Sequence, residues 1–147
     1  MTDEQLIAAA RAAALKAYAP YSNFSVGCAI LGVDGQVVTG ANMENACFRL
    51  GVCAEISALT AAQAAFGLAN IARIAVAGGD GSGEVLVGVS TVTPCGGCRQ
   101  SILEAAQLSG RDIEILCSSG DGTMSERHSI VALIPFGFGP GSLKDAG

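Results

Sequence analysis

Two short cysteine-containing segments, far apart in the sequence, constrain this chain most. Cys53 is followed two positions later by Glu55, and Cys95 and Cys98 form a C-x-x-C pair directly after Pro94. Both sulfurs of such a pair can reach one tetrahedral metal ion, and Cys53 can add a third thiolate from its own segment. A fold that uses these residues must therefore bring the two segments together.

The number of protein ligands separates two kinds of zinc site. Structural sites are usually closed by four protein ligands, whereas catalytic sites keep three and leave a position for water. No fourth candidate stands in a comparable motif, and Glu55 is well placed to shuttle protons rather than to bind metal. We therefore expect one catalytic Zn²⁺ per subunit on Cys53, Cys95 and Cys98, with Glu55 as the catalytic acid and base.

Each half of this pattern also has a simpler explanation. A C-x-x-C pair alone is compatible with two buried core thiols or with a redox pair. Glu55 alone is compatible with an acid in the first turn of a helix, where the helix dipole favours a negative charge. The two halves together favour a metal site.

Composition limits the class of protein. A chain of 147 residues is expected to form a single domain over residues 1–147. Half of its residues are hydrophobic and only 14% are charged, which favours association with other subunits. The net charge of -5 argues against nucleic-acid binding, which needs basic patches.

Targeting signals and disulfides are not expected either. No apolar stretch reaches membrane-spanning length, and the polar start from Met1 to Glu4 does not resemble a signal peptide. The remaining thiols, Cys28, Cys47 and Cys117, lie in largely apolar sequence and are interpreted as small core residues. We expect a cytoplasmic protein without membrane contact.

Helices that alternate with strands predict a layered α/β domain. Two of the helices would begin at the metal-ligand segments, where the helix dipole lowers the pKa of a thiol. The expected elements are a helix from the capping box at Thr2 to about Ala17, strands over 24–33 and 36–42 joined at Asp34-Gly35, a helix over 53–66, a strand over 71–77, a flexible glycine loop over 78–83, a strand over 85–92, a helix over 96–108, a strand over 113–117, a turn at Asp121-Gly122 and a short helix capped by Ser129 before Pro135.

With these motifs in order, the chain resembles the zinc-dependent cytidine deaminases of the small homotetrameric type. The motifs that carry the resemblance are Tyr18-Ala-Pro-Tyr-Ser-Asn-Phe-Ser-Val-Gly27, Asn42-Met-Glu-Asn-Ala46, Cys53-Ala-Glu55, Pro94-Cys-Gly-Gly-Cys-Arg-Gln100 and Phe138-Gly-Pro140. The resemblance implies a three-layer αβα fold with a five-stranded mixed sheet. It also implies conversion of cytidine and deoxycytidine to uridine and deoxyuridine plus ammonia, in pyrimidine salvage.

The resemblance also assigns substrate-binding residues. It implies that Asn42 and Glu44 bind the ribose hydroxyls, that Phe24 contacts the pyrimidine, and that Phe138 reaches a neighbouring subunit's site. Other interpretations stay open at this point. Phe24 is compatible with a core residue, Phe138 with a packing anchor, and Asn42 and Glu44 with polar groups at a hairpin end.

One position departs from the family pattern. Many tetrameric members carry an arginine directly after the catalytic glutamate, where it offsets the charge of three thiolates, but here that residue is Ile56. Zn²⁺ with three thiolates carries a net charge of -1, which weakens its ability to acidify water. Helix N-termini and Arg99, beside Cys98, are the candidates for the missing positive charge.

Three alternatives remain. A deaminase that resembles blasticidin-S deaminase fits Ile56, but such enzymes lack the ribose motif at Asn42 to Asn45. A non-catalytic zinc-stabilised binding protein would need a fourth ligand, such as Cys47 or Cys117. A redox protein would use only the C-x-x-C pair.

Overall fold

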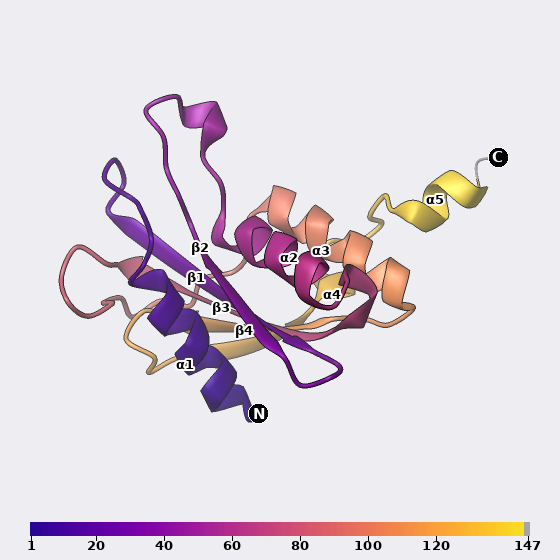
Figure 1. Cartoon of the computed structure of the whole chain (residues 1–147), viewed down its shortest axis with the longest axis horizontal. Helices are drawn as coiled ribbons and strands as arrows, with labels where there is room; N and C mark the ends of the chain where they lie inside the picture. The colour runs from indigo at the N-terminus through magenta and orange to yellow at the C-terminus, as the bar shows by residue number, and fades with distance from the viewer. Residues whose placement is uncertain (146–147) are drawn as a thin grey trace.

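A five-stranded mixed sheet forms the centre of the computed structural model, which describes residues 1–145 (Figure 1). The strand order is β2-β1-β3-β4-β5; the β3–β4 pair is parallel and the other pairs are antiparallel. The elements are α1 (Asp3–Ala14), β1 (Phe24–Gly32), β2 (Val37–Ala41), η1 (Phe48–Leu50), α2 (Ala54–Ala65), η2 (Leu68–Asn70), β3 (Ile71–Asp80), α3 (Gly96–Ser109), β4 (Glu114–Ser119), β5 (Ser125–Ser129), α4 (Ile130–Leu133) and α5 (Pro140–Asp145).

The sheet carries an apolar core on each face. On one face Cys28 and Ile30 of β1 pack with buried residues of α2, α3 and α4. On the other face Ala29, the residue between them, packs with Leu6 and Ala10 of α1. Alternate residues of a strand point to opposite faces, so a strand covered on both sides must be apolar throughout. Figure 1 shows α1 on one side of the sheet and α2 and α3 on the other, which confirms the three-layer αβα fold.

Local sequence signals place most boundaries as predicted. The Thr2 side chain accepts a hydrogen bond from the backbone N–H of Gln5, and the Gln5 side chain binds the Thr2 N–H in return, which is the expected capping box. Gly35, at a φ of 88°, closes the β1–β2 hairpin. Ser129 caps α4 through the N–H of Ala132, as expected.

The strand predicted over 85–92 does not form. Its valines alternate as in a strand, yet Val85, Val87 and Val89 are all exposed. The segment instead crosses the ends of β3 and β4, and a Cβ on Gly79 would lie 2.0 Å from the Val87 carbonyl oxygen. It keeps only isolated bridges, Asp80 to Val87 and Thr91 to Ser119. Close backbone contact with glycines, rather than a ladder, fixes its path.

The fifth strand is β5, which the sequence pattern did not predict. Its residues, Ser125 to Ser129, are polar and show no apolar alternation. It pairs antiparallel with β4 at an edge of the sheet, where water covers much of the strand and no apolar pattern is needed. The predicted glycine loop over 78–83 was also partly wrong, because residues 78–80 continue β3.

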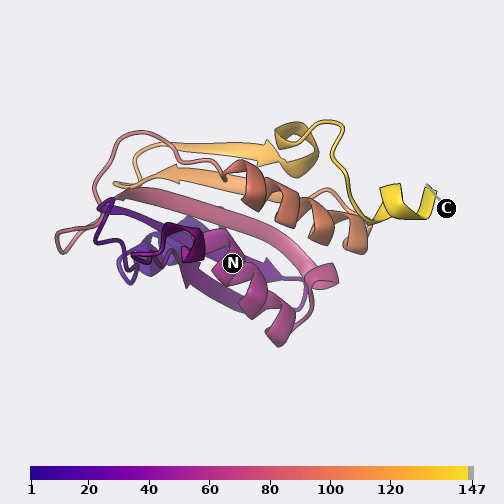
Figure 2. The same cartoon turned by 90° about the horizontal axis from the view of Figure 1, so that it is seen from above.

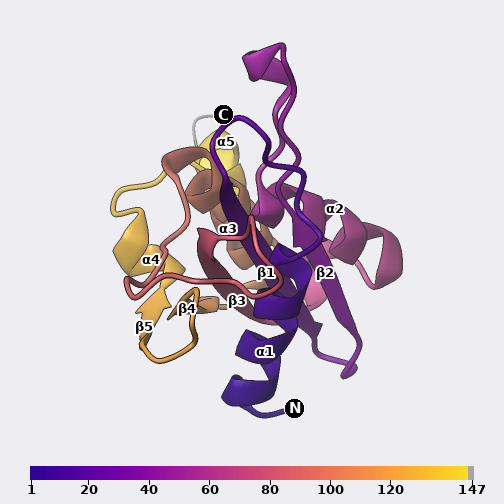
Figure 3. The ribbon, with the colours of Figure 1, turned by 90° about the vertical axis from the view of Figure 1, so that its left-hand side faces the viewer.

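Two segments extend from the layered body. The connection between β2 and α2, which contains η1, forms an arm that projects beyond the sheet (Figures 1 and 3). The chain after α4 runs away along α3 to α5 (Figure 2). Within residues 1–145, none of the helices combines the length and the apolar character that crossing a membrane would require.

At Gly27 the backbone of β1 lies directly against α1, and an added Cβ would lie 1.9 Å from the Ala10 carbonyl oxygen. We expect Gly27→Ala to lower the free energy of unfolding by about 1–3 kcal/mol, because backbone atoms of α1 must move. Urea denaturation with zinc present measures this change.

Gly83→Ala is the matched control, because a Cβ there meets no atom within 4 Å. Its effect should stay within about 0.5 kcal/mol. Equal stability of the two variants would contradict the close packing of α1 on β1.

Candidate active site

Two helices begin side by side at the sites of the cysteine motifs. Cys53 is the N-cap of α2 and Cys95 is the N-cap of α3. Neither cysteine forms a side-chain capping hydrogen bond, so both sulfurs stay available to a metal. The prediction that a helix begins at each cysteine segment is confirmed by this arrangement.

The three sulfurs are spaced as a zinc site requires. The ligand atoms of Cys53, Cys95 and Cys98 all lie within 4.8 Å of one another, and the Cys53 and Cys95 Sγ atoms are 3.9 Å apart. Tetrahedral zinc with Zn–S bonds of about 2.3 Å places its sulfurs roughly 3.8 Å apart. The donor set and its geometry therefore fit Zn²⁺.

Glu55 lies directly beside this cluster. It occupies the first turn of α2 and is only 4% exposed. Its Oε2 accepts a hydrogen bond from the Cys98 thiol at 3.6 Å. Burial raises the pKa of Glu55 above its ordinary value. A carboxyl group in this place can hold a proton next to the metal position.

Of the two N-cap thiols, only Cys95 has the lowered pKa that was expected. The backbone N–H of Cys98 lowers the pKa of Cys95. Burial raises the pKa values of Cys53 and Cys98, so the expectation was wrong for Cys53, although it is an N-cap. A metal ion must displace protons from these thiols to bind.

A cavity of about 220 Å³ opens onto the cluster. Phe24 and Asn42, two of the residues expected to bind substrate, line it together with Cys53, Glu55 and Cys95. Val26, Ala54, Val92 and Thr93 complete the lining. Sequence reasoning missed these four. Val26 could have been found, because it lies two residues after Phe24 and therefore on the same face of β1.

The two residues expected to bind ribose also make hydrogen bonds within the chain. The Asn42 amide accepts from the Val26 N–H at 2.8 Å and donates to the Phe24 carbonyl at 2.9 Å. The Glu44 carboxylate accepts from the backbone N–H of Tyr21 at 2.9 Å and from that of Ser22 at 3.2 Å. These bonds hold the loop before β1 against the start of the arm.

Three of the predicted site residues are not part of the cavity lining. Cys98 is buried behind it within the thiol cluster, and the other two lie further away. Among the described residues that line it, neither Glu44 nor Phe138 is present. Glu44 lies at the loop just described. Phe138 lies on the chain between α4 and α5, is more than half exposed, and its carbonyl accepts a hydrogen bond from the Gln100 side chain of α3.

The other three thiols do not join the cluster. In the part of the chain that the structure describes, neither Cys47 nor Cys117 offers a fourth ligand to it. Cys28 and Cys117 are buried, as expected, but Cys47 is exposed beside η1, so its assignment to the core was wrong. Ile56 is partly buried and packs against the core.

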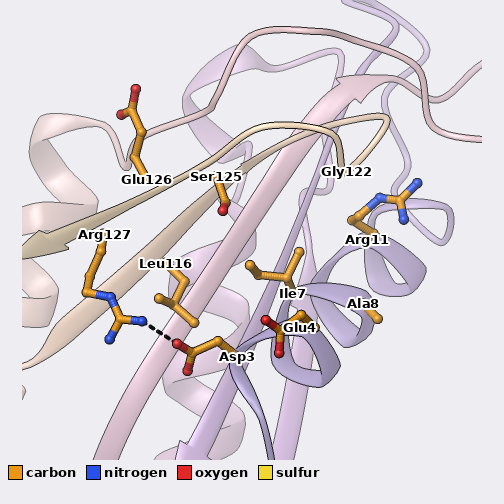
Figure 4. Close-up of a pocket in the computed structure, with 10 residues that line it drawn as sticks. All are labelled: Asp3, Glu4, Ile7, Ala8, Arg11, Leu116, Gly122, Ser125, Glu126 and Arg127. Carbon is orange, nitrogen blue, oxygen red and sulfur yellow. Dashed lines mark hydrogen bonds and ion pairs between the residues drawn. The ribbon is translucent and has the colours of Figure 1, made fainter.

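A second cavity, of about 390 Å³, lies between α1 and the β4–β5 edge (Figure 4). Asp3, Arg11 and Arg127 are among the residues that line it, and their charged groups already have partners. Asp3 pairs with Arg127, and Arg11 donates to the Gly120 carbonyl at 2.9 Å. No cysteine lines this cavity among the described residues, so the smaller cavity at the thiol cluster is the candidate active site.

Removal of any one sulfur should remove the metal. We expect Cys53→Ala, Cys95→Ala and Cys98→Ala each to lose stoichiometric zinc after dialysis, measured by elemental analysis, because two thiolates cannot close the site. Cys47→Ala, which removes an exposed thiol outside the cluster, should keep its zinc. Full zinc retention in any of the first three variants would contradict the ligand set.

Comparison with known proteins places this site in a family. The model of the cytidine and deoxycytidylate deaminase zinc-binding region matches residues 1–109. A cytidine deaminase from Mycobacterium tuberculosis is 46% identical over 92 residues, or 63% of this chain, and the chain spans 62% of that relative's length. A cytidine deaminase from Halalkalibacterium halodurans is 36% identical over 145 residues, which cover 99% of this chain and 100% of the relative.

Comparison with solved structures indicates the same family as comparison with sequences. The crystal structure of cytidine deaminase from Burkholderia pseudomallei has a TM-score of 0.79 at 40% identity, covering 94% of this chain and 100% of that one. The cytidine deaminase structure from Mycobacterium tuberculosis has a TM-score of 0.73 at 34% identity, covering 95% and 99%. With its three-sulfur cluster beside a buried glutamate, this chain belongs to the cytidine and deoxycytidylate deaminase family.

Proposed function

We propose that this chain is a zinc-dependent hydrolase that converts cytidine and deoxycytidine to uridine and deoxyuridine plus ammonia. One observation carries the proposal: a buried carboxyl group, Glu55, lies beside a cluster of three thiols that opens onto a cavity. A structural zinc site closed by four ligands has no use for an adjacent proton carrier. The names of the relatives specify the nucleoside.

The reaction adds water at C4 of the pyrimidine and releases the amino group as ammonia. A bound Zn²⁺ lowers the pKa of water and so supplies hydroxide near neutral pH. Glu55 takes up the proton that water loses and gives it to N3, which makes C4 more electrophilic. After the hydroxide has added to C4, Glu55 takes the proton of the new C4 hydroxyl group and gives it to the amino group. The C4–N bond then breaks, so that ammonia leaves and C4 becomes a carbonyl. One carboxyl group suffices because it alternates between base and acid.

We assign substrate recognition to the walls of the same cavity. Phe24 lines the cavity with an apolar ring that can contact the pyrimidine. Asn42 also lines the cavity, and its side-chain amide lies beside the start of β1. Glu44 supports the adjoining loop and is our second candidate for the ribose hydroxyls. Asn42 and Glu44 can each bind a sugar hydroxyl in addition to, or in place of, a hydrogen bond within the chain. This is because carboxylate and amide oxygens each accept more than one hydrogen bond.

We further propose that the active unit is a homotetramer in which Phe138 closes a neighbour's site. Large apolar side chains are exposed on both extended segments. Phe48 lies on the arm with its ring edge-on to Tyr21. Phe136 is fully exposed and has a φ of 53°, which costs energy for a bulky residue. Association with other copies would cover these rings.

The remaining assignments follow from the proposed reaction. Residues 1–147 would act as a single catalytic domain, since both core clusters pack on one sheet. The product of cytidine deamination is a reusable nucleoside, so we place the enzyme in pyrimidine salvage in the cytoplasm.

Replacing the proton carrier should separate catalysis from metal binding. We expect Glu55→Gln to keep stoichiometric zinc while turnover of cytidine falls about 10²-fold to 10⁴-fold, the usual contribution of general acid–base catalysis. The loss of cytidine absorbance in the ultraviolet measures turnover, and elemental analysis measures zinc.

Glu104→Gln is the matched control, because Glu104 is exposed on α3. Cytosine and blasticidin S serve as comparison substrates for both wild type and variants. Turnover of Glu55→Gln within about tenfold of wild type would exclude Glu55 as the shuttle. Faster turnover of blasticidin S, or equal turnover of cytosine, would overturn the assignment of a nucleoside substrate.

Loss of the Phe138 ring should weaken substrate binding in a neighbouring subunit. We expect Phe138→Ala to raise KM while each subunit keeps its zinc. Mixing Phe138→Ala with Glu55→Gln subunits should restore part of the activity, because some sites then combine an intact Glu55 with an intact Phe138.

Met124→Ala, at an exposed apolar residue of the β4–β5 turn, is the control and should leave KM unchanged. An active monomer at assay concentration, shown by light scattering, would contradict the shared site.

A further inference from the structure

The Cys95 ligand is held on irregular backbone. The segment before it, 91–94, belongs to no strand or helix. Its N-terminal end is tied to β4, where the Val92 N–H donates to the Ser118 carbonyl at 3.3 Å. Cys53 also follows irregular backbone, but Cys98 lies within α3. A ligand at the end of such a segment needs a further contact to hold its position.

Arg99 supplies that contact. Its Nε donates to the Pro94 carbonyl at 2.8 Å, and one terminal nitrogen reaches the Thr93 hydroxyl at 3.4 Å. The other terminal nitrogen donates to the Leu133 carbonyl, at the end of α4, at 3.0 Å. The planar guanidinium therefore joins the residue before Cys95 to a third segment of the chain. A lysine amine cannot match this fork of donors.

Arg99 makes hydrogen bonds but no ion pair among the described residues. By contrast, Arg73 and Arg127 both pair with acids. The Arg99 guanidinium is half-buried and is bound to neutral oxygens only. Its positive charge is therefore not cancelled by an ion-pair partner. Burial raises the pKa of Cys117, a thiol outside the cluster, and the charge of Arg99 offsets part of that rise.

Side chains of α3 hold the chain beyond Leu133 as well. The Gln100 side chain donates to the Phe138 carbonyl at 2.5 Å, and the Gln107 side chain accepts from the Gly141 N–H at 3.0 Å. A Cβ on Gly137 would lie 2.4 Å from Leu103, so this part of the chain fits closely against α3. The residues directly after Cys98 thus bind both ends of the 133–138 segment.

We propose that Arg99 is a positioning residue for the metal site. Its hydrogen bond to the Pro94 carbonyl holds the Cys95 ligand in position. Its hydrogen bond to the Leu133 carbonyl attaches the segment that carries Phe138 to the same guanidinium group. Metal affinity and the order of the 133–138 segment then depend on one side chain. The proposal rests on the zinc site and not on the identity of the substrate, so its test uses metal binding rather than turnover.

The test measures the zinc Kd of Arg99→Gln by competition with a chelator. We expect the Kd to rise about 10-fold to 100-fold, the usual effect of removing a group that orients a metal ligand. The amides of 134 and 136–138 should exchange hydrogen faster in this variant than in wild type. In the Co²⁺-substituted protein the visible spectrum of the site should also change.

Arg111→Gln is the matched control. Arg111 also binds two backbone carbonyls, those of Ala69 and Ile71, but at the far end of α3. Its loss should leave the zinc Kd within about twofold of wild type, since distant sites act independently. An equal rise in both variants would reduce Arg99 to general support of the fold and overturn the proposal.

Arg99→Lys keeps the positive charge but loses the fork, so we expect a zinc Kd between those of wild type and Arg99→Gln. If Arg99→Gln fails to fold, the zinc Kd of Arg99→Lys still tests the proposal. A wild-type Kd in Arg99→Lys would show that charge alone suffices and would overturn the role of Arg99 as a clamp. Loss of cytidine turnover with an unchanged zinc Kd would likewise count against it.

Discussion

The convergence of two helix N-termini on three sulfurs is the constraint on which the rest of this structure depends. Cys53 and Cys95 come from segments that only the sheet brings together, and their sulfurs end 3.9 Å apart. Three thiolates at such distances repel one another, so the buried thiols keep their protons until a cation replaces them. The apolar layers between α2, α3 and the sheet hold the helix starts in place, and the metal supplies the missing attraction.

The sequence was sufficient to predict the cysteine cluster and a layered α/β domain, because those features have local signals. Motif spacing identified the three cysteines and Glu55, and caps and turns such as Thr2 and Gly35 located most helices and hairpins. The fifth strand could not be found in this way. Residues 125–129 are polar, and only their hydrogen bonds to β4, which form after folding, make them a strand.

Contacts distant in sequence explain the other errors. The valines of 85–92 alternate as in a strand, but their backbone crosses Gly79 and Gly120 too closely to form a ladder. The cavity lining likewise needed the fold, since Thr93 becomes part of it only because the crossing segment is fastened near Cys95. The hydrogen bonds from the backbone N–H groups of Tyr21 and Ser22 to the Glu44 carboxylate could not be predicted from the sequence pattern.

The polar edge strand β5 also restricts how copies of the chain can meet. An uncovered sheet edge with apolar residues invites another sheet to add to it, and charged side chains discourage this. Glu126 and Arg127 stand on that edge, so continuous sheets across two copies are disfavoured there. Growth into open-ended fibres through β5 is thereby suppressed, and the apolar arm and tail are left as the surfaces from which a closed assembly can form.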